Sequence, residues 1–230
     1  MRGRGSTMKE VIEALLIAVI FVNFARGFVV QAFKIPSESM KPTLLVGDHL
    51  MVNKFVFGAA GDDRMFLPFK PIERGDLVVF RYPEDPEVDF VKRVIALPGE
   101  TIEIANKSVW IDGQRLDEPY VRIRDRKRMP KRDDFGPLTM GENEYFVMGD
   151  HRDESNDSRY WGPVPRELIT GYPEIIYWSF DRKPPPEGSP LSLRLREMLY
   201  VSTHLLSDTR RDRVLVPVPE ERPSFDFRGR

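Results

Sequence analysis

Two serines in the segment "IPSESMKPTL" have the side-chain type and the setting needed for nucleophilic catalysis. Ser37 and Ser39 lie between two prolines, Pro36 and Pro42, which favour a stiff and extended backbone. A serine hydroxyl is a weak nucleophile, so this chemistry requires an adjacent base. Taken alone, the segment also fits an ordinary turn. A catalytic role requires that another part of the chain place a base beside one of the serines.

The segment "VDFVKRVIALPGE" contains a lysine that could be this base. Alternation along a predicted strand places Lys92 on one face with Phe90 and Val94, and Arg93 on the opposite apolar face. At least one of these two cations must therefore be partly buried. Burial lowers the pKa of a lysine and leaves a neutral amine that can accept a proton. The alternatives are a surface lysine whose stem covers the sheet, and Lys41, which we interpret as a solvated cation.

A dense polar segment, "YFVMGDHRDESNDSRYWGPVP" at residues 145–165, is typical of a loop that builds a site. Its acidic residues could form a calcium loop, but two arginines among them argue against that interpretation. Salt bridges within the loop, holding hydroxyl groups in fixed positions, explain the pattern better. The residues concerned are Asp150, Arg152, Asp153, Ser155, Asp157, Ser158 and Arg159.

The composition excludes several other kinds of site. The 230 residues include 35 basic and 36 acidic side chains, without the basic excess of a nucleic-acid-binding protein. The chain has no cysteine, which excludes disulfides, thiolate metal sites and a cysteine nucleophile. Its three histidines, His49, His151 and His204, lack the spacing of a zinc hydrolase. We therefore expect no metal, no cofactor and no nucleic-acid partner.

The elements that must position these residues are mainly β-strands. Short runs rich in β-branched and aromatic residues, separated by Gly, Pro and Asp, predict an antiparallel or mixed sheet system. "DGQ" at residues 112–114 predicts a tight turn. The predicted strands are Asp48–Asn53, Leu77–Tyr82, Phe90–Leu97, Thr101–Ala105, Ser108–Ile111, Tyr145–Met148 and Glu174–Phe180.

The rest of the chain divides around this β-rich region, which we place at residues 34–180. Residues 122–134 are highly charged and predict a mobile loop. Residues 181–230 combine a Pro-rich linker, an amphipathic helix over 191–206 and an extended, mobile tail. That helix could pack on the core or lie on a membrane interface.

Residues 11–33 form an apolar run that predicts a transmembrane helix about 34 Å long. Arg2, Arg4 and Lys9 lie in residues 1–10, so the positive-inside rule places this N-terminus in the cytoplasm and exports the β-rich region. A cleaved signal peptide is the alternative, but small residues in the required arrangement are missing. We therefore expect an uncleaved anchor.

The three segments above and a fourth, at residues 75–83, lie in order behind an apolar N-terminal run and together resemble the bacterial type I signal peptidases. "PSESMKPTL", "GDLVVFRYP", "DFVKRVIALPGE" and "GDHRDESNDSRYWGPVP" resemble the boxes of that family, and the resemblance extends through Trp178. His151 and Glu154 depart from it, because better-known members carry asparagines there.

The resemblance implies a Ser-Lys dyad, with Ser39 as nucleophile and Lys92 as general base. It implies an oxyanion hole formed by the Ser37 hydroxyl and the Ser39 backbone N–H. Ser155 would orient the lysine amine, and Asp157 and Arg159 would form an ion pair beside it.

The implied protein is a mainly β, membrane-anchored serine endopeptidase that removes signal peptides from exported preproteins after small residues at −1 and −3. It would be a single-pass protein of the bacterial cytoplasmic membrane, with its catalytic domain outside. Its partners would be signal peptides, the lipid bilayer and the secretion machinery. Two alternatives are a self-cleaving repressor, which would carry a DNA-binding domain, and a membrane-tethered β-domain without activity.

Overall fold

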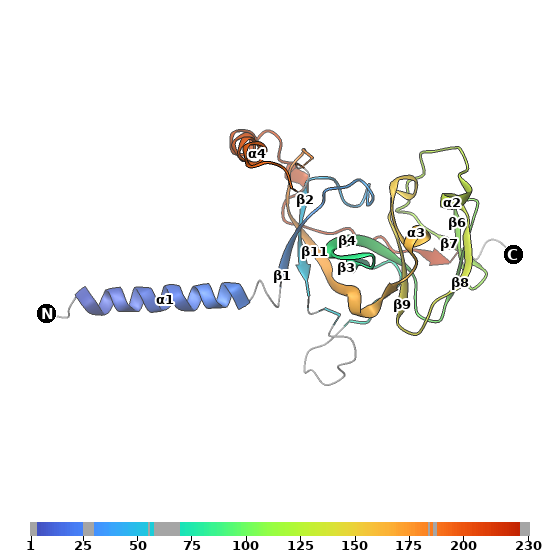
Figure 1. Ribbon diagram of the computed structural model, residues 1–230, viewed down its shortest axis with the longest axis horizontal. Helices are drawn as coiled ribbons and strands as arrows, with labels where there is room; N and C mark the ends of the chain where they lie inside the picture. The colour runs from blue at the N-terminus through green and yellow to red at the C-terminus, as the bar shows by residue number, and fades with distance from the viewer. Residues whose placement is uncertain are drawn as a thin grey trace.

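The strands of the protein form two antiparallel sheets packed against each other (Figure 1). The computed structural model describes residues 4–24, 30–54, 56–57, 70–183, 185 and 188–225. The larger sheet follows the order β1-β2-β11-β3-β4-β9-β10, and β12 pairs with β11. Its strands are β1 (Val30–Lys34), β2 (Asp48–Asn53), β3 (Leu77–Tyr82), β4 (Asp85–Ala96), β9 (Glu144–Met148), β10 (Val164–Pro165), β11 (Ile169–Ser179) and β12 (Val216–Pro217).

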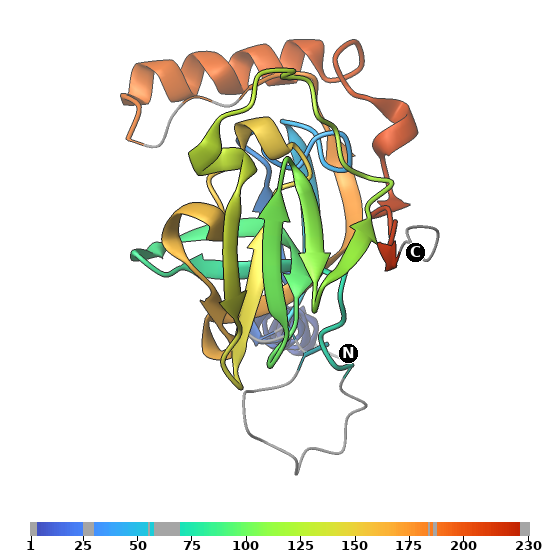
Figure 2. The ribbon, with the colours of Figure 1, turned by 90° about the vertical axis from the view of Figure 1, so that its right-hand side faces the viewer.

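The smaller sheet lies at the end of the molecule opposite the N-terminal helix and faces the viewer in Figure 2. It follows the order β13-β7-β6-β5-β8. Its strands are β5 (Thr101–Ala105), β6 (Ser108–Ile111), β7 (Gln114–Asp117), β8 (Phe135–Thr139) and β13 (Ser224–Phe225). The predicted turn between β6 and β7 is confirmed, with positive φ angles of 50° at Asp112 and 75° at Gly113. Asp-Gly favours this tight hairpin geometry.

Strand β4 contributes side chains to two hydrophobic cores, one on each of its faces. Ile95 and Ala96 are fully buried in the core that also contains Ile102 and Phe146. Val94 is fully buried on the opposite face. Because β4 is apolar on both faces in its second half, its two adjacent cations, Lys92 and Arg93, are both buried, as the alternation requires of at least one.

The N-terminal apolar run contains a helix, but the prediction of one helix over residues 11–33 was wrong at its C-terminal end. Helix α1 covers Arg4–Phe24, whereas Val30–Lys34 is strand β1 and pairs with β2. Hydrophobicity did not distinguish the two because both are apolar; the edge of β2 supplies the backbone partners that make the second part a strand. Residues 1–3 and 25–29 lie outside the described residues.

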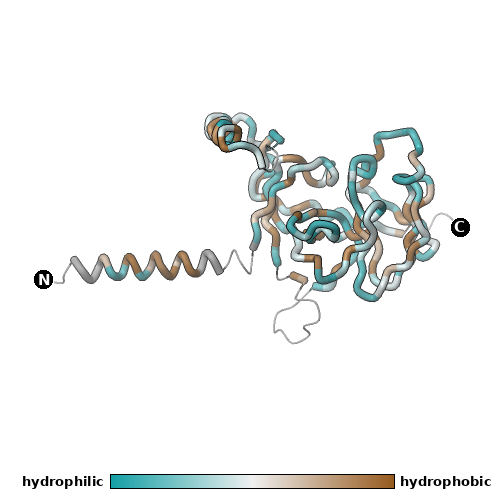
Figure 3. Tube along the Cα trace, viewed as in Figure 1, coloured by the Kyte–Doolittle hydropathy of each residue, from teal (hydrophilic) through white to brown (hydrophobic). Residues whose placement is uncertain are grey.

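The large apolar side chains described between Met8 and Ile20 of α1 are exposed, and the part of the helix that Figure 3 colours is largely hydrophobic. Within the described part of the chain, no helix is both long and apolar enough to cross a membrane.

Two segments expected to be mobile are packed instead. In residues 122–134, helix α2 (Pro130–Asp133) buries Arg132 and Asp133 in an ion pair. In the tail, β12 and β13 pair with the two sheets, and Val218 between them is 4% exposed. Residues 184, 186–187 and 226–230 of the predicted linker and tail lie outside the described residues. The remaining helical elements are α3 (Ser158–Trp161), α4 (Leu191–His204) and single 3-10 turns at Arg152–Glu154, Arg166–Leu168 and Arg211–Arg213.

Candidate active site

The segment that carries Ser39 is a loop between β1 and β2, and buried apolar side chains hold it in place. Ile35, Met40 and Leu44 are each no more than 3% exposed and belong to one core cluster. Ser39, between the first two, is 7% exposed. Buried apolar residues before and after Ser39 therefore fix the serine against the larger sheet.

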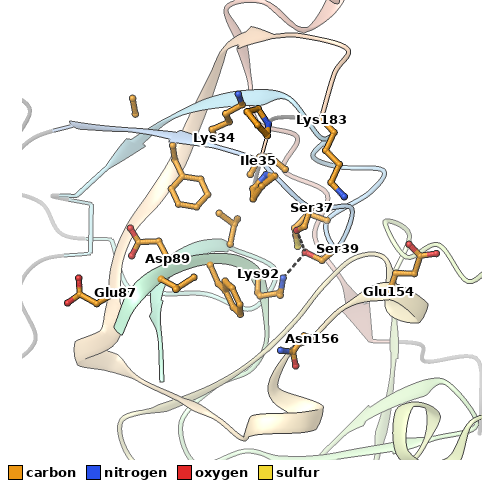
Figure 4. A pocket seen from close by; sticks show the side chains of 18 residues that line it. Lys34, Ile35, Ser37, Ser39, Glu87, Asp89, Lys92, Glu154, Asn156 and Lys183 are labelled. Carbon is orange, nitrogen blue, oxygen red and sulfur yellow. Dashed lines mark hydrogen bonds between the residues drawn. The ribbon is translucent and has the colours of Figure 1, made fainter. Parts of the chain in front are cut away.

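Lys92 of β4 reaches this serine directly. Its Nζ atom lies 2.7 Å from Ser39 Oγ, and Ser37 Oγ lies 3.3 Å from the same oxygen (Figure 4). Lys92 is 4% exposed, and its amine lies 5.3 Å from the centre of the Phe90 ring. Burial lowers the pKa of Lys92 to about 8, with Asp157 and Asp150 opposing the shift and Arg159 adding to it. A buried amine with this pKa, in hydrogen-bond contact with a hydroxyl, can act as its base.

Asp157 and Arg159 form a buried ion pair, with Arg159 Nε 2.8 Å from Asp157 Oδ1 and Nη2 2.9 Å from Oδ2. Burial alone would raise the pKa of Asp157, but the Arg159 guanidinium and the Gly149 N–H hold it below its usual value. Arg159 also donates to the carbonyl oxygens of Arg132 and Arg152. The pair therefore fixes the loop after β9.

A second buried ion pair involves Arg93, the residue next to Lys92 in β4. Arg93 Nε and Nη2 lie 2.8 and 2.7 Å from the Asp150 carboxylate, which also accepts a hydrogen bond from Thr43 Oγ1. Arg93 Nη1 donates to the carbonyls of Gly75 and Glu221, each at 2.8 Å. This network joins the serine loop, β4, the loop after β9 and the C-terminal tail.

The polar loop is braced, but largely by partners from elsewhere in the chain. Arg152 pairs with Glu118, Asp150 with Arg93, and Asp153 with Lys107. Within the loop, Asp157 pairs with Arg159, and a His151 ring nitrogen lies 3.7 Å from a Glu154 carboxylate oxygen, so the expectation that the loop braces itself is confirmed only in part. Nonlocal partners of this kind leave no spacing signal in the sequence.

Gly149 is a site residue that the sequence did not single out. A Cβ atom there would lie 2.4 Å from the Ser39 carbonyl oxygen and 2.3 Å from Ser155 Oγ, closer than any side chain tolerates. Two residues later, the backbone N–H of His151 donates to the same Ser39 carbonyl oxygen at 3.0 Å. A glycine at this position therefore lets the end of β9 approach the serine loop.

Ser155 is buried beside these residues and contributes to lowering the pKa of Asp157. Its hydroxyl nevertheless has no hydrogen-bond partner of normal geometry among the described residues, Lys92 included. The structure thus brings Ser37, Ser39 and Lys92 into contact and places Ser155 nearby without the expected bond to the amine.

One group of side chains among the described residues has the composition of a metal site. Carboxylate oxygens of Glu38 and Glu154 and a ring nitrogen of His151 lie within 4.8 Å of one another. Glu38 already forms an ion pair with Lys41 at 2.9 Å, and neither ring nitrogen of His151 has a hydrogen-bond partner in the part of the chain that the structure describes. The dyad geometry does not involve these three side chains.

A cavity of about 850 Å³ opens beside the dyad, between β1 and the first half of β4 (Figure 4). Its walls include Ala32 and Ile35 on one side, and Val88 and Val91 on the other. In the described part of the chain, β1 is an edge strand, and β4 pairs with β9 only from Arg93 onward. Both strands therefore present unpaired backbone groups to the cavity, which suits an extended peptide.

Comparison with known proteins identifies a family for the chain. The family model described as "Signal peptidase, peptidase S26" matches residues 8–178. "Signal peptidase I" of Aquifex aeolicus is 32% identical, over 84% of this chain and 93% of its own length. "Signal peptidase I P" of Bacillus subtilis subsp. natto is 38% identical, over 77% and 92%. A crystal structure of a signal peptidase I from Enterococcus faecalis is 32% identical and aligns with a TM-score of 0.40 over 46% of this chain and 98% of its own.

The family match covers most of the chain and includes both Ser39 and Lys92, whose side chains are in contact. The predicted resemblance is confirmed, and with it the enzyme class: the chain is a serine peptidase that belongs to the signal peptidase family, peptidase S26.

Proposed function

We propose that this signal peptidase cleaves preproteins with Ser39 as nucleophile and Lys92 as general base. The neutral Lys92 amine accepts the proton of the Ser39 hydroxyl as Oγ attacks the scissile carbonyl. The resulting ammonium gives that proton to the departing amine of the mature protein, which leaves an acyl-enzyme. Lys92 then deprotonates the water that hydrolyses the ester. The observation that carries the proposal is the 2.7 Å contact between these two buried atoms.

The same loop offers donors for the developing oxyanion. We assign this role to the Ser37 hydroxyl and the Ser39 backbone N–H. The Ser37 oxygen lies 3.3 Å from Ser39 Oγ, on the loop that buried Ile35 and Met40 hold in place. A rigid donor at this position would stabilise charge where it forms in the transition state.

Three residues of the polar loop would support the base. The Asp157–Arg159 pair keeps two opposite charges near Lys92, whose effects on its pKa oppose each other, and burial is the larger effect. Among the described residues, the buried Ser155 hydroxyl has no hydrogen-bond partner of normal geometry, and we propose that it orients the Lys92 amine once that amine is neutral.

The cavity beside the dyad would hold the substrate. An extended signal peptide can add as a strand between β1 and β4, because both present free backbone groups. The Gln31 amide and the Asp89 carboxylate, 3.5 Å apart, span the two strands within this region. Shallow pockets along such a strand would admit only small residues at −1 and −3, by steric exclusion of larger ones.

We propose that α1 anchors the enzyme in the bacterial cytoplasmic membrane, as a single pass with the β domain outside. Its 21 residues would extend about 32 Å. Exposed Leu15, Ile17 and Ile20 suit a hydrocarbon environment, and Arg4 and Lys9 in its first turns suit the cytoplasmic headgroup layer. The sequence-based boundary between the anchor and the β domain, at residue 33, then moves toward the N-terminus, because strand β1 begins at Val30. The boundaries at residues 10 and 180 stay predictions. The secretion machinery would deliver the substrate.

The test is cleavage of a preprotein by the full chain in phospholipid vesicles. Wild-type protein should release the mature protein, with cleavage after a small residue shown by N-terminal sequencing. Ser39→Ala should lose at least about a thousandfold in rate. Equal cleavage by the two proteins would contradict the proposed chemistry, and a folded wild-type protein without cleavage would favour a binding role.

A further inference from the structure

Helix α4 presents its large apolar side chains away from the protein. At about 100° per residue, four of these side chains share one face of the helix, and Leu205 and Leu206 extend that face just beyond its last residue, His204, whereas Leu193 falls on the opposite side. Met198 is 73% and Leu206 76% exposed, and no residue of the helix is buried. The face consists of Leu191, Leu195, Met198, Leu199, Leu205 and Leu206, all exposed.

The opposite face of α4 contacts the protein through polar groups. Arg182 Nε lies 3.0 Å from Glu197 Oε1, and its guanidinium lies 3.7 Å from the centre of the Tyr200 ring. The Tyr200 hydroxyl donates to Asp208 at 2.9 Å. A helix that packs on a soluble core does the reverse, with its apolar face inward. The sequence-based alternative of core packing is therefore wrong for this helix.

Two observations identify what covers the outer face. Arg194 and Arg196 fall on its two flanks, where long cationic side chains can reach anionic headgroups while the leucines enter the acyl boundary. Helix α4 also lies at the end of the β domain from which α1 extends, with its axis across that of α1 (Figures 1 and 2). A bilayer crossed by α1 would thus have a surface parallel to α4.

We propose that α4 lies on the outer surface of the anionic lipid bilayer that holds the enzyme, with Leu195, Met198 and Leu199 inserted. This inference rests on the proposed anchoring by α1. A second attachment point would limit rotation of the β domain about its N-terminal connection. The dyad would then keep a constant height above the membrane, where the end of a signal peptide emerges.

The test uses the absence of natural cysteines in the chain. Single variants Met198→Cys, Ile17→Cys and Glu142→Cys of the full protein carry one environment-sensitive fluorophore each. They are reconstituted in vesicles of phosphatidylcholine with phosphatidylglycerol, with and without nitroxide-labelled lipids. Glu142 is exposed in the turn that joins β8 and β9, at the end opposite α1, and is the matched control.

We expect quenching by lipid nitroxides at Met198, with a shallow depth, and at Ile17, with a greater depth, but none at Glu142. Adding Leu195→Ser and Leu199→Ser should remove the quenching at Met198 and leave that at Ile17 unchanged. Both leucines are exposed, so the fold should tolerate these changes. Arg194→Gln with Arg196→Gln should reduce quenching at Met198 in the anionic vesicles and remove its dependence on phosphatidylglycerol.

The two proposals fail in different ways. Quenching at Ile17 without quenching at Met198 would overturn the role of α4 and leave the anchor standing. Absence of quenching at Ile17 would overturn the anchor. A Met198 signal that changes with protein concentration but is not quenched by lipid would show that a second copy of the chain covers this face, and would also overturn the inference.

Discussion

Raising the pH through the pKa of Lys92 should increase kcat/KM for preprotein cleavage. Burial lowers this pKa from 10.5 to about 8. At pH 7 roughly a tenth of the molecules would then carry the neutral amine, against about one in 3,000 for an unperturbed lysine. Because kcat/KM follows the active form of the free enzyme, it should rise about 50-fold between pH 6 and pH 8. Above pH 8 it should rise less than about twofold further.

Cleavage of a signal-peptide substrate by the full chain in detergent, at low substrate concentration, measures this profile. Phe90→Ala should move the rising limb to higher pH, because removing the ring that lies 5.3 Å from the amine admits water and weakens the desolvation. Lys41→Ala is the matched control and should leave the limb in place, since Lys41 pairs with Glu38 on the surface. A limb near pH 4 to 5 would indicate a carboxylate base and refute the assignment of Lys92.

Three further predictions concern single side chains. Lys92→Arg should abolish cleavage and keep the fold, because a guanidinium remains charged, whereas Lys41→Ala should keep most activity in the same assay; the reverse order would identify Lys41 as the base. Ser37→Ala should lower kcat by roughly 100- to 1,000-fold with little change in KM, since its proposed bond forms in the transition state; an unchanged kcat would exclude it from the oxyanion hole. Lys92→Met should raise the free energy of unfolding by up to about 3 kcal/mol at pH 7. The pKa of Lys92 is lower in the folded than in the unfolded protein, so the wild type recovers this stability only as pH rises from about 8 to 10.5. Urea unfolding should therefore show the variant to be more stable at pH 7 but not at pH 11.

Local sequence patterns predicted the bounds of four strands, in three of which burial alternates, whereas Leu77–Tyr82 begins with four buried residues in a row. Asp48–Asn53, Leu77–Tyr82, Thr101–Ala105 and Ser108–Ile111 have the predicted bounds. Strands without such a pattern were missed. Strand β7, "QRLD", has little apolar pattern and is defined by pairing with β6 and β13.

The candidate site shows the same division. Alternation in β4 predicted that cations are buried there, and the resemblance predicted which serine lies opposite Lys92. The partners of Arg93 could not be predicted, because Asp150 and the Glu221 carbonyl lie 57 and 128 residues away along the chain. The tail was predicted to be mobile for the same reason: its order comes from pairing with β11 and β7, which no pattern within the tail encodes.

The central claim, that the Ser39 side chain is the nucleophile, is tested most directly by Ser39→Cys in the full chain, because wild-type protein has no other thiol. A thiolate beside Lys92 is itself a nucleophile, so the variant should cleave a preprotein measurably. Treatment with an alkylating agent should then remove its activity in proportion to the labelled fraction, while treated wild type is unaffected. A fully alkylated variant that still cleaves at its earlier rate would contradict the account.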